Sequence, residues 1–125
     1  MQFDKSMEMR QQAHQRIPGG CHTYAKGDDQ YPLLSPGFIS HGLGSRVWDV
    51  DGNEFIEYGQ GNRSVGLGHV YPAVVQAVQR ELFRGANFSR PSTIEVQAAD
   101  ALLSLVPNAD MVKFCKDGSD ATTAA

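Results

Sequence analysis

The amino-acid sequence predicts an α/β fold in which an N-terminal helix and an antiparallel three-stranded meander lead into the start of a larger α/β domain. Strand-forming residues alternate around two turns at 37–58, and two helical patterns follow at 72–105. An apolar run, a Gly-containing turn and helix-forming residues then lie at 111–125. We therefore expect residues 1–70 to form a segment of a small domain and residues 71–125 to form the start of a large, truncated domain.

Composition narrows the range of functions. The chain has 125 residues, of which 41% are hydrophobic, and this length and content suffice for a core. A net charge of -3 without clustered Lys or Arg argues against a nucleic-acid partner. The N-terminus is polar and the apolar runs are short, so we expect a cytoplasmic protein without membrane contact. Cys21 and Cys115 are far apart, so we expect two free thiols and no metal site.

The first half of the chain alternates ordered elements with turns. A short helix is expected over 6–16, because helix breakers follow it at Ile17-Pro-Gly-Gly20. Residues 21–36 are rich in Gly, Asp, Tyr and Pro and predict an extended loop, a kind of segment that often has a function. Trp48 is expected to be partly buried within the meander. The three expected strands are 37–41, 46–50 and 54–58.

The turn Asp49-Val-Asp51-Gly-Asn53 invites a calcium interpretation, because alternating oxygen side chains before a Gly resemble an EF-hand loop. The spacing does not fit. Gly52 stands at the fourth loop position instead of the sixth, and Gln60 replaces the bidentate Glu at the twelfth. Strands instead of helices flank the motif, so a hairpin turn is the better interpretation.

The glycine-rich stretch from Gly59 to Gly68 matches neither a dinucleotide fingerprint nor a P-loop, and it predicts a close-packed loop. Arg63 within it could hold a substrate anion, but a surface or ion-paired arginine is the simpler alternative. His69 has no second metal-type residue beside it and is expected to orient or pack.

Two helices should follow this loop. Pro72 suits the first turn of a helix that Gly85 ends, and Ser92-Thr-Ile-Glu95 forms a capping box for a second helix that Pro107 stops. The residues expected to face a core are Val75, Val78 and Leu82 in the first helix and Ile94, Ala98, Ala101, Leu102 and Leu105 in the second.

The last stretch predicts a strand at Met111–Cys115, a turn at Gly118 and the beginning of a helix. Free backbone N–H groups, the helix dipole and the Ser119 hydroxyl would together suit a phosphate group. A turn and a cap with no ligand remain the alternative. The last helix has no end signal at Ala125, which indicates a longer protein.

The motifs together resemble the N-terminal part of class III pyridoxal-phosphate aminotransferases, in particular the glutamate-1-semialdehyde 2,1-aminomutase branch. The resemblance runs in order from about Ile17 to Ala125. The matching motifs are Ile17-Pro-Gly-Gly20, the stretch from Gly44 to Tyr58, Gly66-Leu-Gly-His69 before Pro72, and Lys116-Asp-Gly-Ser-Asp-Ala-Thr122.

The resemblance implies the fold-type-I architecture of pyridoxal-phosphate (PLP) enzymes and a homodimer that acts on a small amino donor and acceptor. It assigns Gly118 and Ser119 to the turn that binds the cofactor phosphate, where the family pattern is Ser-Gly-Thr. Asp117 replaces the first Ser, and its carboxylate would repel a phosphate unless it points away. Lys26 stands where the aminomutases carry an Arg for the substrate carboxylate, so the charge is kept but the bidentate fork is lost.

The resemblance also bears on substrate and catalysis. Gly61-Asn62 stands where the aminomutases have Ser-Trp, so a more open and polar pocket around Asn62 and Arg63, and a different amino donor or acceptor, are implied. The family's Schiff-base lysine falls beyond Ala125, and no residue of this segment is expected to be catalytic. The alternative is a non-catalytic fragment, or a phosphate-binding or assembly module of the same fold.

Overall fold

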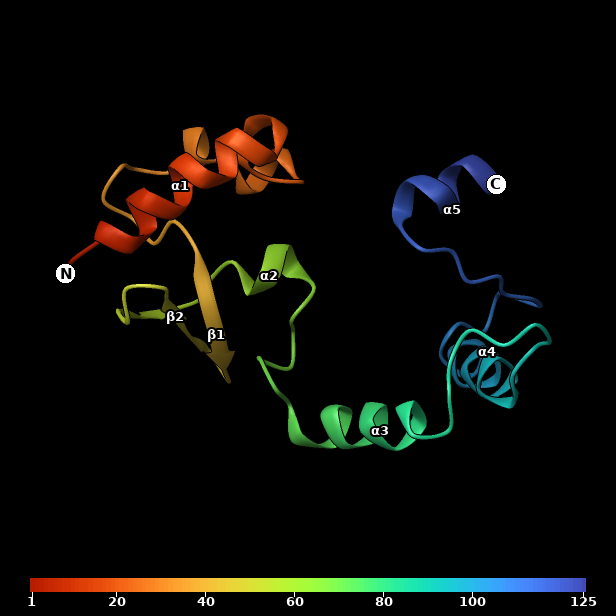
Figure 1. Cartoon of the computed structure of the whole chain (residues 1–125). Coiled ribbons are helices and arrows are strands. Elements are labelled where there is room, and N and C mark those ends of the chain that lie inside the picture. The colour runs from red at the N-terminus through yellow and green to blue at the C-terminus, as the bar shows by residue number, and fades with distance from the viewer. The chain divides into compact units, whose positions relative to one another are not determined.

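The computed structural model describes all residues from Met1 to Ala125. The chain consists of two compact units, Met1–Arg80 and Glu81–Ala125. Helix α3 (Pro72–Leu82) contains the boundary between them (Figure 1). A domain boundary between residues 70 and 71 stays a prediction.

The first unit begins with helix α1 (Asp4–Arg16), close to the expected helix at 6–16. It ends at Arg16, and the next residue, Ile17, has an extended backbone before Pro18. The side chain of Phe3, just before the helix, makes no capping hydrogen bond. Instead, the Asp51 carboxylate is the acceptor for the first turn. It accepts hydrogen bonds from Lys5 N at 2.8 Å, Ser6 N at 3.0 Å and Ser6 Oγ at 2.7 Å. A residue of the meander therefore caps the first turn of α1.

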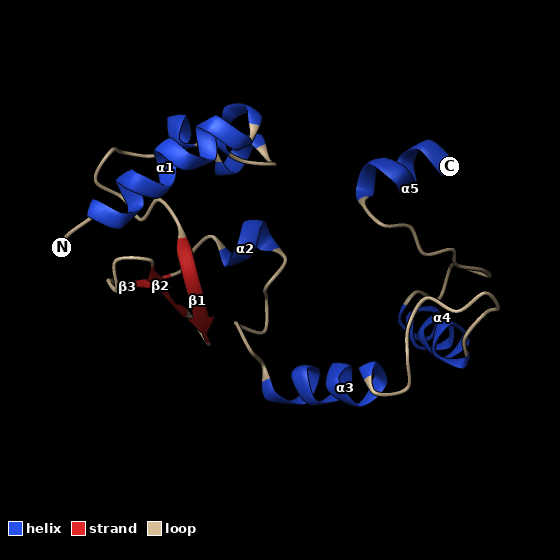
Figure 2. Cartoon of the chain, in the orientation of Figure 1, coloured by secondary structure: helices blue, strands red, loops and turns tan.

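The expected meander is confirmed. Strands β1 (Ile39–Leu43), β2 (Arg46–Asp49) and β3 (Glu54–Ile56) form one antiparallel sheet in that order (Figure 2). Trp48 is half-buried, as expected, and its ring stacks on His41 with the ring centres 4.7 Å apart. The sheet is narrow, and its strands have three to five residues each.

Asp49 organises the turn between β2 and β3. Its side chain is only 2% exposed. Oδ1 accepts from Asp51 N at 3.0 Å and from Asn53 N at 2.7 Å, and Oδ2 accepts from Asn53 Nδ2 at 2.8 Å. Gly52 takes a φ of +87°, a conformation that favours glycine. The carboxylate is thus occupied by donors of its own turn, and strands flank it, which confirms the hairpin interpretation.

The second unit contains helices α4 (Thr93–Leu105) and α5 (Gly118–Ala124). The capping box of α4 is confirmed: the Ser92 side chain accepts from the N3 backbone, and Ser92 N donates to Glu95 Oε1 at 2.8 Å. The strand expected at Met111–Cys115 is wrong, because these residues form neither helix nor strand. A strand needs a neighbour to complete its hydrogen bonds, and the only sheet of the chain is β1-β2-β3.

Few side chains are buried. Ala13 and Val47 are the only buried hydrophobic residues, so the expectation of a sizeable core is wrong. Helices α3 and α4 contain no buried residue, and Val78 of α3 is 52% exposed. The apolar faces of both helices are therefore exposed. None of the helices is both long and apolar enough to cross a membrane.

Candidate functional site

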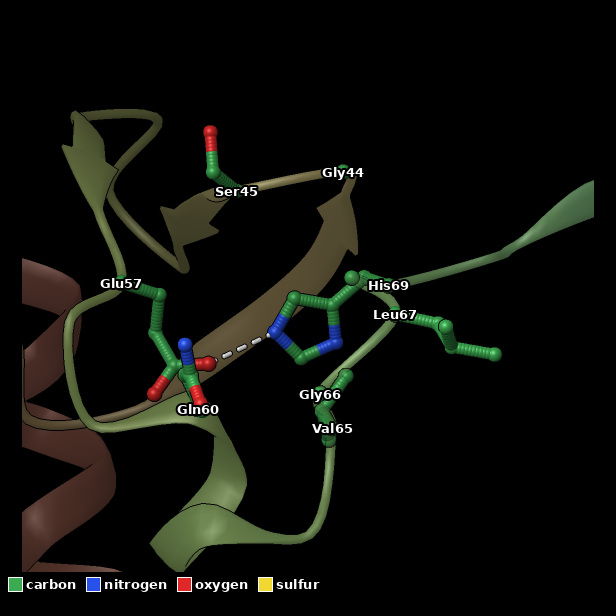
Figure 3. A pocket seen from close by; sticks show the side chains of 9 residues that line it. Gly44, Ser45, Glu57, Gln60, Val65, Gly66, Leu67 and His69 are labelled. Carbon is green, nitrogen blue, oxygen red and sulfur yellow. Dashed lines mark hydrogen bonds and ion pairs between the residues drawn. The ribbon is translucent and has the colours of Figure 1, made fainter.

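A shallow hollow of about 260 Å³ lies in the first unit, where the glycine-rich loop returns to the sheet. The close-packed loop expected there agrees with the geometry: a Cβ added to Gly68 would lie 3.0 Å from the carbonyl oxygen of Gly44. Figure 3 shows the side chains around the hollow. Its lining residues are Gly44, Ser45, Glu57, Gln60, Val65, Gly66, Leu67, Gly68 and His69.

The turn α2 (Gln60–Arg63) beside this hollow has an unusual backbone. Gln60, Gly61, Asn62 and Arg63 have φ values of 47°, 56°, 59° and 71°, so the turn is left-handed. Residues other than Gly incur roughly 1–2 kcal/mol each in this conformation. Strain of this size persists only where surrounding contacts stabilise it, and it is common at functional sites.

Glu57 provides several of these contacts. Gly61 N lies 3.1 Å from Oε1 and 3.2 Å from Oε2 of Glu57, so it donates to the carboxylate. His69 Nε2 donates to Glu57 Oε2 at 2.7 Å, the contact drawn as a dashed line in Figure 3. Both side chains are about three-quarters buried. The Gly61 hydrogen bond, followed by that of His69, lowers the pKa of Glu57 against the effect of burial. The carboxylate is therefore a fixed anionic acceptor for the turn.

His69 is itself fixed from two sides. Its backbone exchanges hydrogen bonds with Gly44, N to O at 2.8 Å and O to N at 2.9 Å. Its ring lies against Gly42, where an added Cβ would be 2.7 Å from the ring Cγ. This agrees with the expected orienting or packing role of His69. The sequence analysis did not assign a role to Glu57. A Glu at the end of an expected strand, four residues before Gly61, is a pattern that could have suggested a hydrogen bond to that turn.

The expected substrate residues fall in two places of the first unit. Asn62 and Arg63 lie together on α2 and are exposed. Lys26 ends a 3-10 turn, Tyr24–Lys26, in the loop 21–36, and it is also exposed. Neither Lys26 nor Arg63 forms an ion pair within the chain. Both cations are thus available to an anion from outside.

The loop that carries Lys26 is held to α1 through Asp28. Asp28 Oδ2 lies 3.2 Å from Arg10 Nε and 3.0 Å from His14 Nε2. The hydrogen bond from His14, followed by the charges of His14 and Arg10, lowers the pKa of Asp28, whereas burial opposes the shift.

This contact predicts an acid-sensitive loop. Because the folded-state pKa of Asp28 lies below its ordinary value of 3.8, the stabilisation is present above that pH and is lost as pH falls through the lowered pKa. We expect NMR signals of loop amides near Asp28 to shift in this acid range, and Asp28→Asn to remove the shift. Asp29→Asn, which changes an exposed neighbour without a hydrogen bond, should leave it. An Asp28 midpoint at or above 3.8 would contradict the assignment.

The expected phosphate turn lies in the second unit, at the start of α5. Asp117 Oδ1 accepts from Asp120 N at 2.9 Å, so the carboxylate caps the helix. The backbone N–H groups of Gly118 and Ser119 have no acceptor in the chain, and a Cβ added to Gly118 would meet no atom within 4 Å. These donors and the Ser119 hydroxyl are exposed. The turn therefore offers neutral donors next to one carboxylate.

Comparison with known proteins identifies the family of this chain. The family model described as Aminotransferase class-III matches residues 24–125. The chain belongs to the class-III aminotransferase family. Among curated relatives of this class-III chain, the glutamate-1-semialdehyde 2,1-aminomutase of Desulforamulus reducens is 38% identical over 123 residues. That of Persephonella marina is 34% identical over 125 residues. The class-III chain spans only 28% and 29% of their respective lengths.

Solved structures agree with the class-III assignment. The FumI protein of Sphingopyxis sp. MTA144, in its PLP internal aldimine form, is 32% identical with a TM-score of 0.88 over 94% of this chain. A transaminase with PLP bound is 30% identical with a TM-score of 0.89 over 99% of this chain. The chain covers 28% of each of these proteins. The expected fold, that of PLP-dependent aminotransferases, is thereby confirmed.

Proposed function

We propose that residues 1–125 form the N-terminal part of a PLP-dependent enzyme that transfers an amino group on a small amino or carbonyl substrate. The observation that carries the proposal is the class-III family match over 24–125, joined by relatives that are aminomutases. Because these relatives are more than three times as long, the complete activity requires sequence outside this segment. The cofactor-binding lysine belongs to that sequence, and the protein is proposed to act as a cytoplasmic homodimer.

The turn at Gly118 and Ser119 is proposed to bind the cofactor phosphate. Its unpaired N–H groups and the Ser119 hydroxyl are the donors that a phosphate accepts, so the residues fit the group. Asp117 is already engaged with Asp120 N, which holds one carboxylate oxygen on the helix and away from a ligand role. When bound, PLP supplies an electron sink for chemistry at the carbon that carries the amino group.

Lys26, Asn62 and Arg63 are proposed to bind the substrate. Lys26 and Arg63 have no carboxylate partner in the chain, which leaves their charges for an anionic substrate group. Asn62 adds a neutral donor and acceptor on the same turn as Arg63. Their contribution is to bind and orient, and no residue of the segment is proposed to move a proton.

The proposal is tested with the 125-residue chain and with the product of the complete reading frame. Each is incubated with PLP, treated with borohydride and mapped by mass spectrometry, and each is assayed for amino transfer. We expect one stoichiometrically labelled lysine and activity in the complete product only. Lys5, Lys26, Lys113 and Lys116 are the only lysines of the segment, and nothing fixes one of them at the reactive end of the cofactor.

Two results would count against the proposal. Activity or stoichiometric labelling in the 125-residue chain would show that the chain carries its own chemistry. A complete product that binds PLP but transfers no amino group from any donor would favour a non-catalytic module of the same fold.

A further inference from the structure

The left-handed turn Gln60–Arg63 needs a reason to keep its conformation. Three of its four residues have a Cβ, and all four have φ between 47° and 71°. Within the turn, Arg63 N donates to Gly59 O at 3.0 Å and Ser64 Oγ donates to Gly61 O at 2.6 Å. These contacts close the turn locally but do not attach it to the sheet. Attachment to the sheet comes from Glu57 and His69.

The attachment runs through a chain of contacts that begins at the β1–β2 turn. His69 is bound to Gly44 by two backbone hydrogen bonds, and its ring is confined by Gly42 of β1. Its Nε2 donates to Glu57, which stands just after β3. Both carboxylate oxygens of Glu57 then face Gly61 N, in the middle of the turn. Each link is fixed by the previous one, and the last link is the turn itself.

We propose that Glu57 and His69 are positioning residues that hold Gln60–Arg63 in its left-handed form and thereby set where Asn62 and Arg63 meet the anionic group of the substrate. The inference rests on the proposed function of Asn62 and Arg63. It extends that function, because it assigns the placement of Asn62 and Arg63 to a hydrogen-bonded pair of side chains outside the turn. The pair acts on substrate binding through the backbone amide of Gly61.

The test compares variants of the product of the complete reading frame. Glu57→Gln removes the charge, and His69→Leu removes the donor. Glu54→Gln is the matched control, because Glu54 lies on β3 and pairs with Arg46 on the other side of the strand from this chain of contacts. Gly42→Ala disturbs the same contact in a second way, since its Cβ would displace the His69 ring while Glu57 and His69 themselves stay unchanged.

Hydrogen exchange of the peptide that contains Gly61 is the first readout. We expect faster exchange in Glu57→Gln, His69→Leu and Gly42→Ala, and no change in Glu54→Gln. Steady-state kinetics is the second readout. We expect KM for the anionic substrate to rise about tenfold in the same three variants, with kcat close to that of the unaltered protein, because the lost interaction is one of binding. His69→Gln, which keeps an N–H donor, should recover part of the loss.

If the Gly61 peptide exchanges no faster in Glu57→Gln, His69→Leu and Gly42→Ala than in Glu54→Gln, then Glu57 and His69 do not hold the turn. Faster exchange with an unchanged KM would overturn the link between the turn and the substrate. Absence of amino transfer in the unaltered protein would overturn the proposed function, and with it the substrate half of this inference. The exchange comparison would still decide whether Glu57 and His69 hold the turn.

Discussion

Replacing Asp49 by alanine will destabilise the sheet by about 3 kcal/mol, a change on the order of 100-fold in its folding equilibrium. The side chain accepts three hydrogen bonds, from Asp51 N, Asn53 N and Asn53 Nδ2, and it is buried. Bonds to a charged group contribute roughly 1.5–3 kcal/mol each, and their sum is reduced because the turn relaxes once the side chain is lost. Urea unfolding followed by Trp48 fluorescence measures the effect, since Trp48 is the only tryptophan and precedes Asp49 in β2.

Two further variants test whether the effect comes from the hydrogen-bond acceptors of Asp49. Asp29→Ala removes an exposed carboxylate without a hydrogen bond and should leave the urea midpoint unchanged. Asp49→Asn should also be destabilising, because the new NH2 group would face the NH2 group of Asn53, and both are donors. The Asn53 amide cannot flip to relieve this without losing its hydrogen bond to Gln2 O. An Asp49→Ala midpoint equal to that of Asp29→Ala would refute the role of Asp49.

Ser119→Ala is expected to weaken PLP binding to the complete gene product by tenfold or more. If the hydroxyl donates to the cofactor phosphate, its loss removes a hydrogen bond to a charged group, worth about 1.5–3 kcal/mol. The measurement is the dissociation constant of PLP, obtained from cofactor absorbance after equilibrium dialysis.

The same helix supplies the control. Thr123→Ala removes a hydroxyl that makes no hydrogen bond and should leave PLP affinity unchanged. Asp117→Asn should tighten binding, because the amide oxygen can still accept from Asp120 N while the charge beside the phosphate is lost. Equal PLP affinity in Ser119→Ala and the unaltered protein would remove Ser119 from the phosphate site.

Local signals allowed the prediction of those elements that depend on neighbours in the sequence. The capping box at Ser92 and the turn at Gly52 are of this kind, and both were predicted correctly. The strand expected at Met111–Cys115 was wrong because a strand depends on a partner, which no local pattern reveals. The apolar faces of α3 and α4 were predicted from their periodicity, and neither helix contains a buried residue within this segment.

The candidate site shows the same difference between features that depend on sequence neighbours and features that depend on distant partners. Asn62 was named from a resemblance and Arg63 from its place in the glycine-rich loop. The left-handed backbone that presents them was not foreseen, because neither Gln60 nor Arg63 is a residue type that favours positive φ. The Glu57–His69 contact joins residues twelve positions apart across a glycine-rich loop. Sequence spacing alone does not indicate such a pair.

The cap that Asp51 provides for α1 has a consequence for the order of folding. The acceptor for Lys5 N and Ser6 N lies 45 positions or more along the chain, and Asn53 Nδ2 reaches Gln2 O in the same region. A short helix gains little from its own hydrogen bonds, so its first turn remains frayed until such acceptors arrive. We therefore expect the N-terminal end of α1 to be completed only after β2 and β3 have closed their turn, even though α1 precedes them in the sequence.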